Sequence, residues 1–209
     1  LQHQAEHYQA EVGPLGWMLT PAADEAAQIL ENGDRRKGLR ILDVGAGSAV
    51  WSLAMLRRDR SSTVTALDWP EVLTVAQQQA KALQLETQLR VLGGDFHNIP
   101  LPEKAFDVAI LANITHLETP EQNQRLFGKV YEALDTSGKA VIIDVFPGSI
   151  EGDLTRLLYR LGLALRTEHG QVYSNEELSR QLREAGFISS ELTLLQSPPH
   201  ILGMLLARK

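Results

Sequence analysis

The sequence has 209 residues, of which 44% are hydrophobic and 22% are charged, the proportions of an ordinary globular protein. A formal net charge of −6 and a sequence pI near 5.5 argue against a nucleic-acid partner, because binding to phosphates requires a basic surface. The chain contains no cysteine, no secretory signal and no apolar run near the ~20 residues that cross a bilayer, so we expect a cytoplasmic protein without disulfides or membrane contact.

Strand patterns and helix patterns alternate along the chain, which predicts an α/β protein with a mostly parallel sheet covered on both faces. Residues 1–38 are expected to form an N-terminal helical segment, acting either as a lid over a ligand cleft or as a cover for the sheet edge. Within this segment, Thr20 and Pro21 have the features of a helix cap and first turn, so a helix is predicted from Pro21 towards Arg36.

Residues 39–209 are expected to form the main domain. The predicted strands span 39–44, 63–67, 89–92, 106–112, 139–145, 188–195 and 201–207. The predicted helices span 50–58, 70–83, 120–136, 153–165 and 175–186. The last two strands are expected to pair in antiparallel fashion, with a proline-rich turn between them.

A glycine turn follows the first strand, in the run Asp43-Val44-Gly45-Ala46-Gly47. Glycine allows the backbone to turn tightly and lets a ligand approach the start of the next helix. Asp68 lies 21 residues after Gly47, at the end of the second strand, where a carboxylate can accept hydrogen bonds from both ribose hydroxyls. The pattern therefore predicts a nucleotide-cofactor site.

Two details separate the cofactors that such a turn binds. A dinucleotide site requires a third, small residue where this chain has Val50, followed by the bulky Trp51. Asp43 would place an anion near a pyrophosphate, but it suits a cationic ligand. S-adenosylmethionine (SAM) carries a sulfonium and an ammonium group, so the sequence favours SAM over a nicotinamide cofactor.

Further candidates follow the next strands. After the third strand come Gly94, Asp95 and Phe96, where the carboxylate can bind the adenine amino group and the ring can pack on adenine. The alternative is that Asp95 caps a turn and Phe96 belongs to the core. Asn113 ends the fourth strand, beside the cleft where α/β sheets bind ligands. Trp69 either packs against adenine or staples the third helix.

These motifs resemble those of the small-molecule O-methyltransferases, a family of class I SAM-dependent methyltransferases. The run from Leu42 to Ser48, together with Asp68-Trp69-Pro70-Glu71-Val72, is similar to the family's glycine turn and its second acidic motif. Gly94-Asp95-Phe96 and Asn113-Ile114-Thr115-His116 resemble two further family elements, and the match covers residues 39–146. The resemblance implies a Rossmann-like, doubly wound, seven-stranded sheet, mostly parallel with a C-terminal antiparallel hairpin.

The resemblance also implies an activity for residues 39–209, namely methyl transfer from SAM to a hydroxyl of a small, secondary-metabolite-like acceptor, leaving S-adenosylhomocysteine (SAH). His116 would be the general base and Asp144 the acid that orients it. The residues that would contact SAM are Asp43, Gly45, Gly47, Asp68, Asp95 and Phe96.

The sequence departs from the family pattern at three points. Ala49 stands where the family turn ends in glycine, and Val172 stands where a second acid is expected to support the histidine. Only about 38 residues precede the first strand, so the family's N-terminal dimerisation domain is absent or removed. Either a homodimer or a chain without its dimerisation domain is consistent with this length.

Several readings stay open. Trp17, Met18 and Tyr159 are candidates for lining the acceptor pocket, but each also fits a helix core. His116 fits a helix entry as well as a base, and no metal-binding motif is present. The alternatives to O-methylation are C- or N-methylation of a small molecule and a non-catalytic SAM-binding domain. A nicotinamide oxidoreductase is the least favoured.

Overall fold

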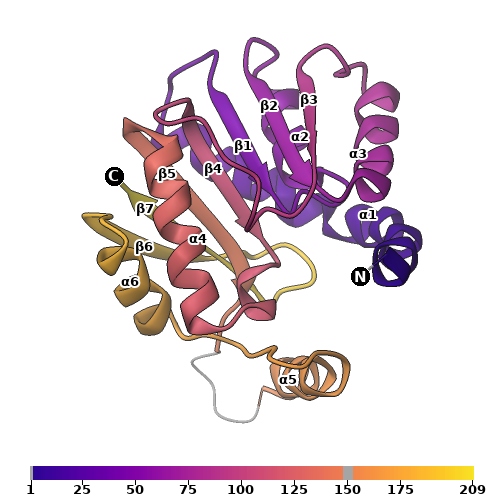
Figure 1. The fold of residues 1–209 in the computed structure, drawn as a ribbon, viewed down its shortest axis with the longest axis vertical. Coiled ribbons are helices and arrows are strands. Elements are labelled where there is room, and N and C mark those ends of the chain that lie inside the picture. The colour runs from indigo at the N-terminus through magenta and orange to yellow at the C-terminus, as the bar shows by residue number, and fades with distance from the viewer. Residues whose placement is uncertain (1, 148–152) are drawn as a thin grey trace.

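A computed structural model shows one seven-stranded sheet with helices on both faces (Figure 1). It describes residues 2–147 and 153–209, with side chains from residue 12 onwards. The strands are β1 (Arg40–Val44), β2 (Thr63–Asp68), β3 (Leu89–Gly93), β4 (Phe106–Ala112), β5 (Leu134–Val145), β6 (Ser189–Leu194) and β7 (Leu202–Arg208). Their order is β3-β2-β1-β4-β5-β7-β6. The first five strands run parallel and β7 is antiparallel to both neighbours, which confirms the predicted sheet and its terminal hairpin.

The helices form two layers around this sheet. They are α1 (Gln2–Gly33), α2 (Val50–Arg58), α3 (Pro70–Ala82), the 3-10 helix η1 (Thr115–Leu117), α4 (Pro120–Ala133), α5 (Leu154–Arg166) and α6 (Asn175–Glu184). The first three helices pack on one face of the sheet, and α4 and α6 pack on the other. Alternate residues of the central strands supply the two apolar cores, as a sheet buried on both faces requires. No helix in the described residues is long and apolar enough to span a bilayer.

The predicted start of the first helix at Pro21 is wrong, because α1 already begins at Gln2. Pro21 has no N–H to donate within the helix. The neighbouring Thr20 hydroxyl donates to the Gly16 carbonyl at 3.0 Å, so the polar groups around the proline still form a local hydrogen bond. Residues of α1 on both sides of Pro21, such as Val12 and Ala22, are buried. Their packing outweighs the tendency of a proline to end the helix before it. In the described residues α1 covers α2 and α3, while residue 1 of the predicted segment lies outside them.

The fifth strand also begins earlier than predicted, at Leu134 instead of Lys139. The sequence predicts that the preceding helix runs to residue 136, just before Ser137-Gly138, but α4 ends at Ala133 and β5 passes through this pair as an irregularity in its pairing with β4. A Cβ atom at Gly138 would lie 2.8 Å from the Asp135 carbonyl oxygen, so only glycine fits there.

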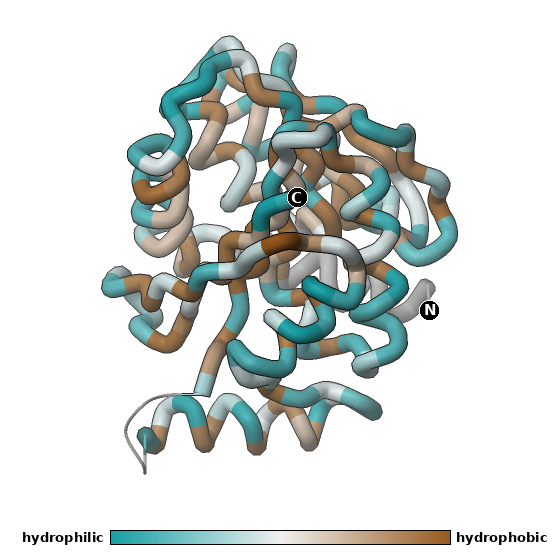
Figure 2. The backbone as a smooth tube through the Cα atoms, turned by 90° about the vertical axis from the view of Figure 1, so that its left-hand side faces the viewer, coloured by the Kyte–Doolittle hydropathy of each residue, from teal (hydrophilic) through white to brown (hydrophobic). Residues whose placement is uncertain are grey.

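Helix α5 lies beyond the carboxyl ends of the central strands (Figure 1). Apolar and polar residues alternate along α5, which is the separate helix at the bottom of Figure 2. Five leucines are exposed, namely Leu154, Leu157, Leu158, Leu161 and Leu165. Tyr159 and Leu163 are directed towards the rest of the molecule instead: Leu163 is buried, and Tyr159 packs with core residues. This orientation brings Tyr159 to the end of the sheet where the predicted site residues gather.

Candidate functional site

The predicted site residues lie at the carboxyl ends of the parallel strands. Asp43 is the penultimate residue of β1, Asp68 the last of β2, and Asp144 the penultimate residue of β5, while Asn113 follows β4. The strand order reverses between β1 and β4, which are neighbours although they are far apart in the chain. Ligands of open α/β sheets bind outside the carboxyl ends of the strands at such a reversal. The fold thus gathers these side chains at the edge of the sheet where a ligand crevice is expected.

The glycine turn after β1 is held in a left-handed conformation, with φ of 62° at Gly45 and 55° at Gly47. The N–H of Gly45 donates to the Leu67 carbonyl at 2.8 Å, which binds the turn to the end of β2. A Cβ atom at Gly45 would lie 2.6 Å from a methyl group of Ile114, so a larger residue has no room. Ala49 also has a positive φ of 58°, a conformation that glycine adopts without strain and alanine does not.

Two carboxylates are buried beside this turn. Asp43 is only 1% exposed and accepts a hydrogen bond of 2.5 Å from the Ser52 hydroxyl. Asp68 accepts from the N–H groups of Gly47 at 2.8 Å and Trp69 at 2.7 Å. Burial raises the pKa of Asp43 to about 7, against the lowering effect of the Ser52 hydroxyl, and the nearby Asp68 raises it further. Burial also raises the pKa of Asp68.

In the part of the chain that the structure describes, neither carboxylate has a cationic partner. Across the described residues, no lysine or arginine forms an ion pair with Asp43 or Asp68. Nor do three His, Asp or Glu side chains of that part of the chain gather in a way that could hold a metal ion. Buried carboxylates are normally paired or neutralised. The pair therefore fits an organic cation, and SAM is such a ligand.

Three further candidate cofactor residues are Gly94, Trp69 and Asn113. The N–H of Gly94 donates to the backbone carbonyl of Asp68 at 2.8 Å, which joins the loop after β3 to the end of β2. The Trp69 side chain is 37% exposed and precedes α3 as its N-cap residue. Asn113 has a left-handed backbone, with φ of 57°, where the chain leaves β4. Gly94 and Trp69 thus adjoin Asp68, whereas Asn113 lies at the end of β4, and contact of these three residues with a cofactor stays a prediction.

The loop after β3 is internally braced. The Asp95 carboxylate accepts from the N–H of His97 at 2.9 Å and from the amide of Asn98 at 2.6 Å. Lys129 of α4 donates to the carbonyls of Phe96 at 2.7 Å and His97 at 3.2 Å. The Phe96 ring is half-buried against the core. Asp95 thus caps a turn, as the alternative reading held, and contact of Asp95 or Phe96 with adenine stays a prediction.

The structure joins His116 to Asp144. His116 lies in η1, and its Nδ1 is 2.7 Å from the Asp144 carboxylate, in a buried pair. The same carboxylate accepts from the Thr115 hydroxyl at 2.5 Å and from the Val145 N–H at 2.8 Å. Because Asp144 accepts, we assign the ring proton to Nδ1, and Nε2 is then the basic nitrogen. An imidazole held in this way is suited to take up a proton.

The loop that carries His116 is fixed by residues that sequence reasoning missed. The Asn123 side-chain amide donates to the Thr115 carbonyl at 3.0 Å. The Gln171 N–H donates to the His116 carbonyl at 2.9 Å. Val172, which replaces the expected second acid, packs on the apolar core instead. Asn123 gave no sequence signal beyond its place in the first turn of a predicted helix.

The three weaker acceptor candidates differ in position. Tyr159 contacts His116, with ring centroids 5.8 Å apart and planes at 85°. Trp17 is 84% exposed and lines a hollow between α1, α2 and α3 together with Ser48 and Gln79. Met18 is also exposed, and no hydrogen bond or ring contact among the described residues links Trp17 or Met18 to His116. The structure brings Tyr159 to the candidate base and does not bring the other two.

The fold and the site define a Rossmann-like protein with a nucleotide-cofactor crevice and a histidine–aspartate pair at its edge. The family profile of the O-methyltransferase domain matches residues 24–188. The chain therefore belongs to the O-methyltransferase domain family.

Individual relatives agree with this assignment. The chain is 28% identical over 158 residues to the tetracenomycin polyketide synthesis 8-O-methyl transferase TcmO of Streptomyces glaucescens, covering 75% of this chain and 46% of the relative. It is 28% identical over 176 residues to the L-tyrosine C(3)-methyltransferase of Streptomyces lavendulae, covering 81% and 47%. A crystal structure of an O-methyltransferase family 2 protein from Planctomyces limnophilus in complex with apigenin superposes with a TM-score of 0.85 at 27% identity, covering 98% and 61%. The chain thus spans about half the length of the curated relatives it matches.

Proposed function

We propose that this chain is the catalytic domain of a SAM-dependent O-methyltransferase that acts on a hydroxyl group of a small, secondary-metabolite-like molecule. The observation that carries the proposal is the buried Asp144–His116 pair. It lies at the same edge of the sheet as the buried carboxylates of Asp43 and Asp68, which have no cationic partner within the described residues. The half of the crevice at Asp43 and Asp68 suits a cation. The half at His116 and Asp144 suits removal of a proton from the acceptor. A relative named as a polyketide O-methyl transferase and a neighbour crystallised with apigenin support this choice of acceptor class.

The residues present fit SAM at the cofactor half of the crevice. When bound, SAM supplies the methyl group, as an electrophilic carbon attached to a sulfonium. Asp68 would accept the ribose hydroxyls, and Asp43 would balance the positive charge of the ammonium group. Trp69 and Phe96 would hold adenine, while Gly45 and Gly47 give the backbone room to approach.

The chain's own chemistry is the positioning of the acceptor and the movement of one proton. His116 Nε2 would accept the proton of the acceptor hydroxyl, and the buried Asp144 would hold the ring and stabilise the imidazolium that forms. Alignment of the acceptor oxygen with the methyl carbon would account for much of the rate, because the reaction is an in-line displacement.

C-methylation is the second candidate, favoured by the similarity to the L-tyrosine C(3)-methyltransferase. A phenol that has lost its proton carries electron density on the ring carbon beside the oxygen as well as on the oxygen. The same base therefore serves both reactions, and the orientation of the acceptor decides between them.

Calorimetric titration of the protein with SAM, SAH and NAD tests the cofactor. Both SAM-type ligands are expected to bind and NAD is not. Incubation with SAM and a panel of phenols, followed by mass spectrometry, is then expected to show a product heavier by one methylene group. A product that still ionises as a phenol would favour C-methylation, and binding of NAD alone would contradict the proposal.

SAM is expected to bind more tightly as pH rises through about 7, because burial raises the pKa of Asp43 to about 7. A carboxylate that faces the ammonium group must be ionised, so below this pKa binding releases a proton, and affinity falls by up to about tenfold per pH unit. The cofactor-free fold shows the opposite slope. Its folded state binds the proton more tightly than the unfolded chain, so stability falls from about pH 4 to about pH 7 and then levels off.

Calorimetric titrations on either side of neutrality measure this dependence, with Asp43→Asn as the matched control. That variant has no proton to lose at this position, so its weak binding is expected to be flat with pH. The same slope in Asp43→Asn would show that another group titrates.

A further inference from the structure

Tyr159 is the side chain that lies against the basic nitrogen of the site. Its hydroxyl oxygen is 3.3 Å from Nε2 of His116 and 3.4 Å from Nδ1. The two rings meet nearly at right angles. Within the described residues, these two nitrogens are the polar atoms that lie within hydrogen-bond distance of the Tyr159 hydroxyl.

The two nearly equal distances define where this hydroxyl lies. A partner on the lone-pair axis of Nε2 would be much farther from Nδ1 than from Nε2, because the two nitrogens point away from each other across the ring. The hydroxyl oxygen is therefore off that axis, beside the ring. Nδ1 already donates to Asp144 at 2.7 Å. The Tyr159 hydroxyl therefore leaves the lone pair of Nε2 unoccupied, and it stands next to the place where an acceptor's oxygen would meet that nitrogen.

The Tyr159 hydroxyl is suited to donate a hydrogen bond. Burial, with Asp144 adding to its effect and Arg166 opposing it, holds the pKa of Tyr159 well above its usual value. The phenol therefore keeps its proton at working pH. Neither nitrogen of His116 offers it a well-aligned acceptor, since one is protonated and the other is approached from the side. Its proton is available for an oxygen that enters the crevice.

We propose that Tyr159 is a further catalytic residue, whose hydroxyl donates a hydrogen bond to the acceptor's oxygen while His116 removes that oxygen's proton. The inference rests on the proposed function and adds a residue to it. The acceptor's O–H bond breaks, its proton passes to Nε2 of His116, and Tyr159 keeps its own proton throughout. The negative charge left on the oxygen is shared with the Tyr159 hydrogen bond until the electron pair forms the new bond to the methyl carbon and the sulfur takes up the electrons of the bond it loses.

Tyr159→Phe tests this role, because it removes the hydroxyl and keeps the ring that packs on His116. The probe is 4-nitrophenol, titrated by the absorbance of its phenolate in the presence of SAH, so that no turnover is needed. In the wild type the bound phenol is expected to ionise more readily than in Tyr159→Phe, by about one pKa unit, which corresponds to one hydrogen bond to a charged oxygen. With a phenolic substrate, kcat is expected to fall about tenfold with little change in KM.

Tyr131→Phe is the matched control, since Tyr131 packs on Phe187 and under Lys209, away from the crevice. It is expected to behave as the wild type in both measurements, and thermal unfolding should be similar for all three proteins. Equal ionisation of the bound phenol in the wild type and in Tyr159→Phe would overturn this inference and leave the proposed function standing. Failure of the wild type to bind 4-nitrophenol, or any other phenol of the panel, would count against both.

Discussion

Replacing His116 by alanine is expected to lower kcat for a phenolic acceptor by about 10²- to 10⁴-fold, the usual contribution of a general base. The affinity for SAM should change little, because the His116 side chain is assigned to the acceptor and the proposed SAM contacts come mainly from the ends of β1, β2 and β3. Steady-state kinetics and calorimetry on the same preparation separate the two effects. The loss should shrink as pH rises towards the pKa of the acceptor, since hydroxide then supplies the phenolate.

His169→Ala is the matched control, because His169 is exposed and only loosely paired with its neighbour Glu168. A second variant, Asp144→Asn, keeps the shape of the pair but favours the other ring tautomer, so it is also expected to lower kcat strongly. If His116→Ala turned over at the wild-type rate, His116 would not be the base, and acceptors that need no deprotonation would be favoured.

Replacing Asp68 by alanine is expected to weaken SAM binding by about 100-fold or more. The reason is that a ribose held by two hydrogen bonds to an ionised carboxylate loses both, at about 1.5 kcal/mol or more each. The variant also leaves the N–H groups of Gly47 and Trp69 without their acceptor, so the glycine turn loses support. Asp68→Asn retains one oxygen for these N–H groups and should therefore fold better while still binding SAM weakly.

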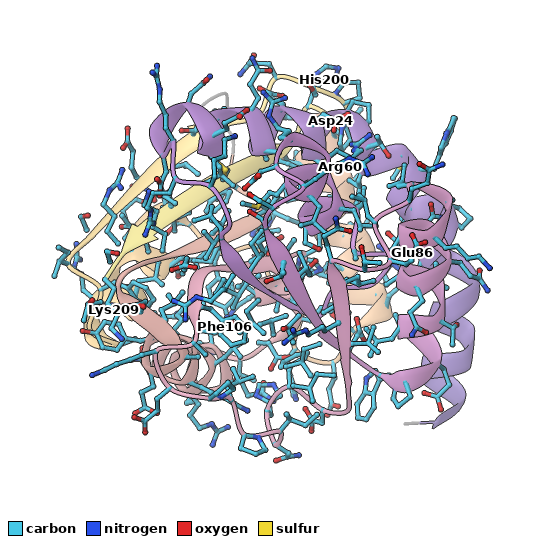
Figure 3. All side chains as sticks on the ribbon, turned by 90° about the horizontal axis from the view of Figure 1, so that it is seen from above. Asp24, Arg60, Glu86, Phe106, His200 and Lys209 are labelled. Atoms are coloured by element: carbon cyan, nitrogen blue, oxygen red, sulfur yellow. The ribbon has the colours of Figure 1, made fainter. Side chains whose placement is uncertain are left out.

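Glu86→Ala is the control for this series. Glu86 and Phe106 both lie at the end of the molecule that faces the viewer in Figure 3, where β3 and β4 begin. This end is opposite the candidate site. The affinity of the Glu86→Ala variant for SAM is expected to equal that of the wild type in calorimetric titrations. Unchanged affinity in Asp68→Ala would show that the cofactor binds elsewhere.

Much of this protein could be predicted from local patterns. Strands β1 to β4 and helices α2 and α4 begin within one residue of their predicted positions, because short apolar runs and capping residues are local signals. Thr119 and Ser174 both form capping boxes, which are set by residues three positions apart in the sequence. The acids and glycines were found for a related reason. In a parallel sheet every strand delivers its last residue to the same edge, so the pattern of strand ends already predicts a shared crevice.

The tertiary structure decided what depends on residues far apart in the chain. Packing against α2 and α3 carries α1 through Pro21, where a helix start was predicted, and pairing with β4 carries β5 through Gly138, where no strand was predicted. His116 and Asp144 are 28 residues apart, and their contact was implied by family resemblance alone until the fold placed them together.

The contact of Tyr159 with His116, across 43 residues, had no sequence signal at all. The sequence by itself determined the order of strands and helices and the starts of most of them, because propensity, capping and turn chemistry act over a few neighbours. Which side chains meet across the crevice, and which carboxylates stay buried without a cation, was decided only by the tertiary structure, because burial and distance arise from packing.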